Sequence, residues 1–151
     1  KVPSLELEDG THLFDSPVIC EYLDHMAGGD PLLPVEGARR WAVLKAQALG
    51  DGILDAALSL VMESRRPDAQ QSKFWQARWI SAIHRGVDDI ANDVRADDAV
   101  FDLGRISYAC ALGYLDFRLP DLDWRAPHPG LADWFSDMSG RESFALTAPP
   151  G

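Results

Sequence analysis

Residues 5–26 decide how this chain folds, and they read LELEDGTHLFDSPVICEYLDHM. Leucine alternates with glutamate before the pair Asp9-Gly10, which is a strong signal for a tight turn because both turn positions need a positive φ. Side chains that alternate in this way point to opposite faces of a strand. We therefore expect two antiparallel strands, at residues 3–8 and 11–14, on either side of this pair.

A helix is expected directly after this hairpin. Ser16 is well placed as its N-cap and Pro17 as its first helical residue, and apolar residues recur at helical spacing as far as Met26. The glycine pair that begins at Gly28 would end the helix. A two-stranded hairpin with one helix is marginal alone, and a parallel neighbour strand would need a βαβ unit of about 30 or more residues upstream of Lys1. The sequence is therefore predicted to start inside a domain.

The rest of the chain is predicted to form a helical bundle. Apolar residues recur at helical spacing from residue 36 onward, and most of the five tryptophans fall on faces expected to pack in the core. Gly50 and Gly52 interrupt the first helical pattern, and each costs a helix about 1 kcal/mol relative to alanine. This cost indicates a bend or a close contact there. The predicted helices cover residues 36–63, 71–95, 103–118 and 130–141.

The third predicted helix, at residues 103–118, begins with an unusual charge. Asp102 is suited to cap it, and Phe101 is suited to the hydrophobic contact that often accompanies a cap. Arg105 puts a positive charge in the first turn, where it opposes the helix dipole. We therefore expect Arg105→Asp to raise the melting temperature. The residues predicted to face inward are Ile106, Ala109, Cys110, Gly113, Tyr114 and Phe117.

The composition argues against several classes of function. The net charge is −10, so the chain lacks the basic face that displaces counterions from nucleic acid. No apolar run reaches the roughly 20 residues that cross a bilayer, and the first residues do not form a signal peptide, so we expect no membrane partner and a cytoplasmic location. The histidines have no metal-ligand spacing, which predicts no metal. Cys20 and Cys110 are predicted to be buried free thiols.

Four blocks of sequence have the order and spacing of a known family. The first two are Val2-Pro3 ahead of the hairpin and residues 15–17, Asp-Ser-Pro, at the start of the helix. The third is residues 50–55, GDGILD, in the first long helix, and the fourth is the last predicted helix, where Pro129 opens the pattern Pro-x-Leu-x-x-Trp. Over essentially its whole length the chain resembles the cytosolic glutathione transferases, with a bacterial-like overall pattern.

The resemblance implies an α+β remnant of a thioredoxin-like domain followed by an all-α helical bundle, which is the glutathione transferase architecture. It places the C-terminal half of the thioredoxin-like, glutathione-binding domain at residues 1–29, a linker at 30–35 and the all-α C-terminal domain at 36–151. In this family the residue that stabilises the glutathione thiolate follows the first strand. That strand would lie upstream of Lys1, so the resemblance names no catalytic residue here.

The resemblance also implies a glutathione site built from five residues of this chain. If the Val2-Pro3 bond is cis, the backbone of Val2 would pair with the cysteinyl part of the ligand; otherwise Pro3 merely starts an edge strand. Ser16 would hold the γ-glutamyl carboxylate at the helix start, or serve as an ordinary cap. Asp15, where the family more often has Glu, would lie near the ligand's ammonium group. Asp51 would reach that group across a dimer interface, or be a solvated helix residue.

The implied function is transfer of the glutathione thiolate to a small apolar electrophile, as in detoxification. Glutathione would be the co-substrate, no metal would be needed, and the protein would be a homodimer. The alternative is a non-catalytic, glutathione-transferase-like protein that binds ligands or acts as a scaffold. The second substrate, and the choice among transferase, isomerase, dehalogenase and peroxidase activities, do not follow from these residues.

Overall fold

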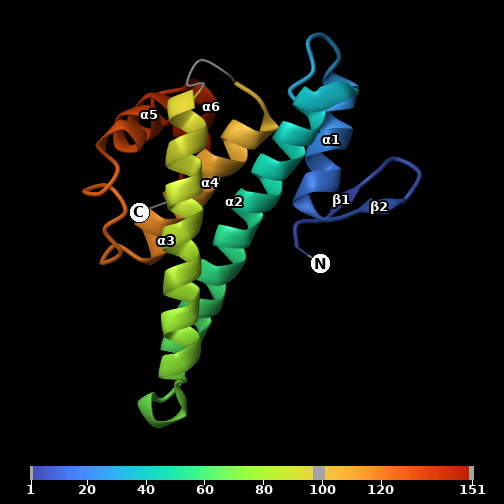
Figure 1. The fold of residues 1–151 in the computed structure, drawn as a ribbon. Helices are drawn as coiled ribbons and strands as arrows, with labels where there is room; N and C mark the ends of the chain where they lie inside the picture. The colour runs from blue at the N-terminus through green and yellow to red at the C-terminus, as the bar shows by residue number, and fades with distance from the viewer. Residues whose placement is uncertain (1, 97–100, 150–151) are drawn as a thin grey trace.

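The computed structural model of the chain describes residues 2–96 and 101–149. Its longest helices, α2 and α3, lie side by side, with α1 and the β-hairpin on one side of α2 and α5 on the other (Figure 1). The elements in chain order are β1 (Leu5–Glu6), β2 (His12–Leu13), α1 (Ser16–Ala27), α2 (Gly37–Ser64), the short 3₁₀ helix η1 (Asp68–Gln70), α3 (Lys73–Ala96), α4 (Leu103–Arg118), α5 (Pro129–Ser139) and α6 (Glu142–Thr147).

Hydrophobic periodicity placed the long helices correctly. The observed bounds of α2, α3, α4 and α5 lie within two residues of the predicted ones, and those of α4 coincide with them. The short helix α6 was not predicted, because six residues are too few to show a period. The all-α character expected of the second part of the chain is therefore confirmed for the described residues.

The β-hairpin is shorter than the strands predicted at 3–8 and 11–14. β1 and β2 pair antiparallel over two residues each. The N–H of Leu7 donates to the Thr11 carbonyl at 2.8 Å, and that of Gly10 donates to the Leu7 carbonyl at 2.9 Å. The turn therefore takes up residues that were expected to extend the strands. Gly10 has the positive φ, 84°, that such a turn needs.

Helix α1 begins one residue earlier than predicted. Asp15, and not Ser16, occupies the N-cap position, so Ser16 is the first helical residue and Pro17 the second. Both Asp and Ser suit an N-cap, and proline is tolerated throughout the first turn because N–H groups there have no intrahelical acceptor. The helix ends at Gly28, as predicted, where φ is 66°.

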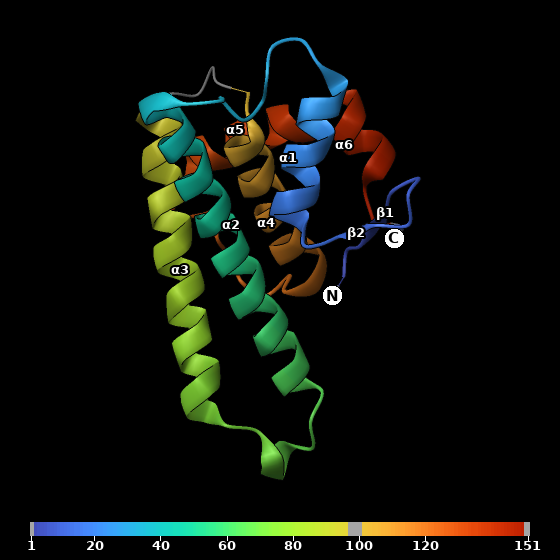
Figure 2. The same ribbon diagram turned by 90° about the vertical axis from the view of Figure 1, so that its right-hand side faces the viewer.

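Polar contacts join α1 to the segment that leads into α2. The two carboxylate oxygens of Asp24 accept hydrogen bonds from the N–H groups of Leu32 and Leu33, each at 2.9 Å. Glu21 of α1 accepts a hydrogen bond from the guanidinium of Arg40 at 2.9 Å. These contacts hold α1 to the linker and to the first turn of α2; the linker runs from the end of α1 to the start of α2 in Figure 2.

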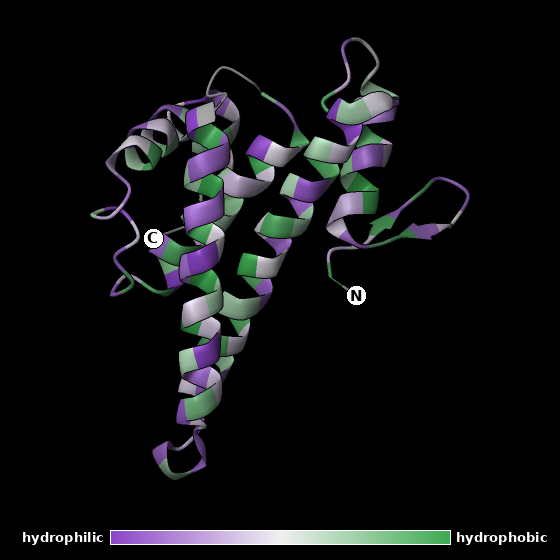
Figure 3. Cartoon of the chain, in the orientation of Figure 1, coloured by the Kyte–Doolittle hydropathy of each residue, from purple (hydrophilic) through white to green (hydrophobic). Residues whose placement is uncertain are grey.

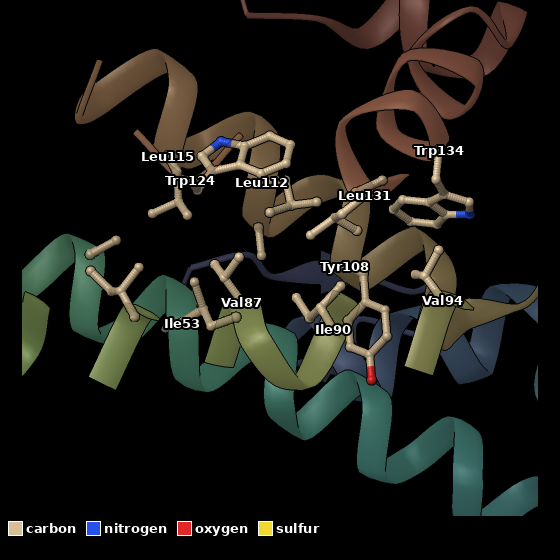
Figure 4. Packing of buried hydrophobic residues seen from close by; sticks show 14 of the residues in the cluster. Ile53, Val87, Ile90, Val94, Tyr108, Leu112, Leu115, Trp124, Leu131 and Trp134 are labelled. Carbon is tan, nitrogen blue, oxygen red and sulfur yellow. The ribbon is translucent and has the colours of Figure 1, made fainter. Parts of the chain in front are cut away.

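The main core lies between α2, α3 and α4, and α5 covers one end of it. Ile53 of α2, Val87 and Ile90 of α3 and Leu112 of α4 point toward one another (Figure 4), and each is at most 2% exposed. The side of α3 that faces the viewer in Figure 3 is largely hydrophilic, as expected of an amphipathic helix. The bundle therefore owes its assembly to apolar stripes at helical spacing.

Helix α4 turns a different side to the core from the one predicted. Of the residues expected to face inward, Ala109 is buried, but Cys110 and Phe117 are exposed. The helix is apolar on two sides, so its periodicity could not decide which side enters the core. The side that does so carries Leu103, Tyr108, Ala111, Leu112 and Leu115.

The tryptophans also depart from the prediction that most of them pack in the core. Trp124 and Trp134 are buried, but Trp41 and Trp75 are 68% and 46% exposed. Trp75 stacks on Trp79 near the start of α3, with ring centroids 5.9 Å apart. The exposure of Trp41 and Trp75 leaves apolar surface on the outer faces of α2 and α3.

A polar network joins α3 to α4 around Arg105. Asp102 caps α4 as predicted, because its carboxylate accepts the Arg105 N–H at 3.0 Å. The side chain of Arg105 is buried, and its Nη2 donates to the Asp93 carbonyl at 3.0 Å. The Tyr108 hydroxyl donates to the Asp93 carboxylate at 2.8 Å, and burial, together with this hydrogen bond, raises the pKa of the phenol. The arginine therefore ties two helices together in spite of its unfavourable place in the helix dipole.

This buried position overturns the expectation that Arg105→Asp would raise stability, and we predict a lower melting temperature. The substitution removes the donor to the Asp93 carbonyl and buries a carboxylate next to Asp102, which should cost about 2 kcal/mol or more. Arg39 is at the same third helical position in α2 but is exposed, so Arg39→Asp should be neutral or stabilise by about 0.3–1 kcal/mol. Thermal unfolding followed by circular dichroism compares the two. A higher melting temperature for Arg105→Asp would contradict the role of the network.

Glu63 holds the turn between α2 and α3. Its Oε1 accepts the N–H of Ser72, just before α3, at 2.6 Å, and its Oε2 lies 3.2 Å from Nη1 of Arg66. Glu63 is 8% exposed. The hydrogen bond from Ser72 lowers the pKa of the Glu63 carboxyl, with help from Arg66 and against the opposing effect of burial. The carboxylate thus serves as a cap for a helix that follows it by nine residues.

The lowered pKa makes the contribution of Glu63 to stability depend on pH. Its folded-state pKa lies below the unfolded-state value of about 4.3, so the contribution is present at neutral pH and is lost as the pH falls through the folded-state pKa. We predict that Glu63→Gln lowers the melting temperature at neutral pH and that the gap closes in acid. Glu8→Gln, in the exposed hairpin, is the control and should show no gap. A Glu63→Gln gap that persists unchanged in acid would argue against the cap.

Candidate functional site

The predicted glutathione site lies where the hairpin meets α1. The Val2-Pro3 peptide bond is cis, as the family resemblance implied, and Val2 is 92% exposed. Ser16, in the first turn of α1, is exposed, and Asp15 is half-buried. The N-terminal end of the described chain lies near this first turn in both views (Figures 1 and 2). The structure therefore brings four of the five predicted residues to one end of α1.

The first turn of α1 can receive an anion. The first intrahelical hydrogen bond of α1 runs from the N–H of Ile19 to the Asp15 carbonyl, at 3.0 Å. The N–H groups of Ser16 and Val18 precede this bond, so they have no acceptor within the helix. No acidic residue lies within the first turn itself, and Asp15 precedes it at the N-cap. A carboxylate placed there could accept hydrogen bonds from the backbone and from the Ser16 hydroxyl.

Asp51, the fifth predicted residue, lies on the side of α2 that approaches α1. It is half-buried. Burial, and then the negative charge of Asp51, raise the pKa of Cys20 on α1, so the carboxylate is close enough to act on the Cys20 charge. Cys20 follows Ser16 by one helical turn. The structure therefore places Asp51 beside the α1 helix of its own chain.

Gly50 permits a close approach between α2 and α4. A Cβ at Gly50 would lie 2.5 Å from the Oγ of Ser107 and 3.0 Å from its carbonyl oxygen, which is closer than packed atoms allow. At Gly52, a Cβ would have no described neighbour within 4 Å. Of the two explanations offered for the glycine pair, a close contact therefore applies at Gly50.

An apolar cavity of about 570 Å³ lies among α4, α5 and α6. Its α4 wall is the apolar side that was predicted to enter the core. Sequence reasoning missed this cavity because α6 was not expected and because α4 was assigned a single apolar face. The lining residues include Ile106, Cys110, Tyr114, Phe117, Phe135 and Phe144.

One cysteine, Cys110, lies on the cavity wall, and the other, Cys20, lies on α1. Cys20 and Cys110 are free thiols, as predicted, but the predicted burial was wrong for Cys110, which is exposed on the cavity wall. Desolvation still raises the pKa of the Cys110 thiol, and Cys20 adds to the shift. Cys20 and Ile106 both pack against a small core around Leu33. Through this small core, Cys20 of α1 lies close to the Ile106 end of the cavity wall.

Residues 2–96 and 101–149 also bear on two other kinds of site, a metal site and a membrane-spanning helix. Within these residues no group of three or more His, Cys, Asp or Glu side chains is arranged to hold a metal ion. His128 pairs with Asp88, its Nε2 lying 3.0 Å from Oδ1. No helix in the same ranges is both long and apolar enough to cross a membrane.

The sequence is similar to those of glutathione transferases. Residues 73–137 match the family described as "Glutathione S-transferase, C-terminal domain". The uncharacterized GST-like protein YibF of Escherichia coli (strain K12) is 39% identical over 153 residues, which cover 99% of this chain and 76% of that protein.

The fold is similar to that of a solved glutathione transferase family member from Pseudomonas fluorescens Pf-5. Its structure with bound glutathione is 42% identical in sequence and has a TM-score of 0.97, and the match covers 100% of this chain and 75% of that one. Its structure with bound S-(propanoic acid)-glutathione has a TM-score of 0.96, with 100% and 78% covered. The predicted architecture, part of a thioredoxin-like domain followed by a helical bundle, is confirmed.

The close approach at Gly50 leads to a prediction with a control on the same helix. Gly50→Ala should lower the free energy of unfolding by about 1–3 kcal/mol, because the added Cβ meets the backbone of Ser107. Gly52→Ala adds the same atom where it has no described neighbour, so it should stabilise the helix by about 0.5–1 kcal/mol. Denaturant unfolding measures both. Equal effects of the two substitutions would show that the contact does not need glycine.

Proposed function

The chain belongs to the glutathione S-transferase family, and from this premise we propose that the protein transfers the thiolate of glutathione to an apolar electrophile. One observation carries the proposal: an apolar cavity begins beside a helix whose first turn suits an anionic ligand. Cys20 packs against the same small core as Ile106 of the cavity wall, and its effect on the pKa of Cys110 also supports this juxtaposition. A transferase of this kind needs both sites next to each other, because the sulfur must reach the electrophile.

Glutathione would bind along the start of α1. Its γ-glutamyl carboxylate would accept hydrogen bonds from the hydroxyl and N–H of Ser16. Its ammonium group would face Asp15 and Asp51, and its cysteinyl backbone would pair with the exposed backbone of Val2, beside Pro3. The relative from Pseudomonas fluorescens Pf-5, which has bound glutathione, supports this assignment.

The electrophile would occupy the cavity among α4, α5 and α6. Aromatic and aliphatic side chains make up most of its wall. Transfer of an apolar molecule from water into the cavity is therefore favourable. The structure of the same relative with S-(propanoic acid)-glutathione supports a site with room for a substituent on the sulfur.

The group that lowers the pKa of the glutathione thiol is proposed to lie upstream of Lys1. In the family this residue donates a hydrogen bond to the sulfur, which raises the thiolate fraction near neutral pH. We also propose the domain division given above: the thioredoxin-like part at residues 1–29, the linker at 30–35 and the all-α domain at 36–151. The chain spans about three quarters of the length of the relative from Pseudomonas fluorescens Pf-5.

We further propose that the protein is a cytoplasmic homodimer formed through α2 and α3. Large apolar side chains on these helices are exposed, among them Trp41 and Met62 on α2 and Phe74 and Trp75 on α3. Met62, Phe74 and Trp75 come from the adjoining ends of α2 and α3, and exposed apolar side chains that lie together often mark an interaction surface. The place of Asp51 beside its own α1 favours a role at the glutathione site of its own chain, although the resemblance implied a reach across the interface. Sedimentation equilibrium tests the dimer.

Ser16→Ala tests the glutathione site. Removing the hydroxyl takes away a charge-assisted hydrogen bond, so the dissociation constant of glutathione should rise by about 10-fold or more. Ser136→Ala, an exposed serine on α5, is the matched control and should leave the constant unchanged. Isothermal titration calorimetry on the complete protein makes the comparison. Unchanged binding by Ser16→Ala would contradict the placement of the carboxylate.

A turnover assay distinguishes the proposed transferase from the alternative, a non-catalytic binding protein. The complete protein should consume glutathione in the presence of an organic halide, and the rate should fall in Ser16→Ala at subsaturating glutathione. Binding that depends on Ser16, without turnover of any electrophile, would instead identify a non-catalytic glutathione-binding protein.

A further inference from the structure

The side chain of Phe135 forms part of the cavity wall between α4 and α5. It is half-buried, so one part of the ring packs in the protein and another part faces the cavity. A Cβ added at Gly113 of α4, which also lines the cavity, would come within 3.7 Å of Cζ of Phe135. The ring therefore lies over this part of α4, and its position helps to set the shape of the cavity.

Trp124 and Arg125 contact the Phe135 ring from outside the cavity. The buried ring of Trp124 meets it edge to face, with the centroids 5.7 Å apart and the planes at 84°. The guanidinium carbon of Arg125 lies 4.3 Å from the centroid of the Trp124 ring and 5.5 Å from that of Phe135. Both residues are absent from the described lining of the cavity. Their contact with the cavity is therefore made through Phe135.

Asp116 of α4 fixes both of these side chains. Its Oδ1 accepts the indole N–H of Trp124 at 2.9 Å. The guanidinium of Arg125 donates to both carboxylate oxygens, from Nη1 to Oδ1 and from Nη2 to Oδ2, the latter at 2.6 Å. A planar guanidinium makes this two-pronged pairing with a fixed orientation, which the ammonium group of lysine cannot do. Asp116 therefore determines where Trp124 and Arg125 hold the ring.

The ion pair is better suited to hold a side chain in place than to stabilise the fold. The Arg125 and Asp116 side chains are 46% and 31% exposed, and ion pairs that are open to water contribute little to stability. An ordered cavity wall has a different benefit. A side chain that is already immobile before the ligand arrives does not have to lose its freedom on binding, and this loss weakens binding by about 3- to 10-fold for each side chain.

We propose that Asp116 and Arg125 are positioning residues for the apolar group of the electrophile. Together with Trp124 they hold Phe135 in place for that group, although none of the three lines the cavity. The inference rests on the proposed function and deepens it, because it names residues outside the cavity that set its affinity for the group carried on the sulfur.

The first experiment compares the dissociation constants of glutathione and S-hexylglutathione by isothermal titration calorimetry on the complete protein. The hexyl chain adds only an apolar group to the sulfur, so the gain in affinity over glutathione reports on the cavity. Asp116→Asn keeps an acceptor for Trp124 and removes the charge that pairs with Arg125. It should reduce this gain by about 3- to 10-fold. The dissociation constant of glutathione itself should change by less than about 2-fold.

Two further variants guard against a general loosening of the structure. Arg125→Lys keeps the positive charge but loses the two-pronged pairing, so it should reduce the gain in the same direction. Asp88→Asn is the matched control, because Oδ1 of Asp88 lies 3.0 Å from Nε2 of His128 at the start of α5. It removes another carboxylate that pairs with this helix, and it should leave the gain unchanged.

The second experiment asks whether Asp116 acts through Phe135. Phe135→Ala removes the ring and should itself reduce the gain in affinity for S-hexylglutathione. In that background Asp116→Asn should have no further effect, because two residues that act through one contact are not additive. A merely structural role for Asp116 would instead add its own loss to that of Phe135→Ala.

The results that would overturn the inference differ in what else they affect. An unchanged gain in both Asp116→Asn and Arg125→Lys would show that the wall does not need the ion pair. Additive losses in the double variant would show that Asp116 acts by another route. Either result would leave the proposed transfer of glutathione standing. If S-hexylglutathione bound the unaltered protein no more tightly than glutathione, the placement of the electrophile in the cavity would be wrong, and the inference with it.

Discussion

Close contact between α2 and α4 is the constraint on which the rest of the structure depends. It requires glycine at two places, because a Cβ at Gly50 would lie 2.5 Å from the Ser107 Oγ and one at Gly104 would lie 2.6 Å from the Ala46 Cβ. With the two backbones this close, α2 and α3 enclose one side of α4. The opposite side is left to face α1 and the apolar cavity. One contact between helices therefore positions both the core and the candidate site.

Polar groups fix the ends of helices that apolar contacts would leave free to slide. At the end of α4, the Asp116 carboxylate accepts the indole N–H of Trp124 at 2.9 Å and pairs with Arg125, whose guanidinium lies 4.3 Å from the centroid of the Trp124 ring. Arg105 and Glu63 play the same part at the start of α4 and at the α2–α3 turn. Hydrogen bonds are directional whereas apolar burial is not, so these few contacts determine the register of the bundle and hence the shape of the cavity.

Helical periodicity was sufficient to predict the bundle, whereas the residues proposed to bind glutathione came from the family blocks and remain a prediction. The predictions for α4 and for the start of α1 were wrong because each required a choice between two options that are physically equivalent. Leu112 and Tyr114 lie on different apolar sides of α4, and nothing local tells the core side from the cavity side. Asp15 and Ser16 are equally good caps, so the helix start was placed one residue late. The burial of tryptophan is a statistical tendency, and Trp75 departs from it because it lies on an outer face of the bundle.

No residue of the segment 2–27 is buried, although this segment carries four of the five residues proposed to contact glutathione. Local opening of this part of the molecule breaks few apolar contacts, so its amide hydrogens should exchange with solvent through local opening. The amide hydrogens of α2 to α4 should exchange only through global unfolding. A conjugate that spans the first turn of α1 and the cavity would join the two parts and protect both. Ligand occupancy would then decide whether the protein unfolds as two cooperative units or as one.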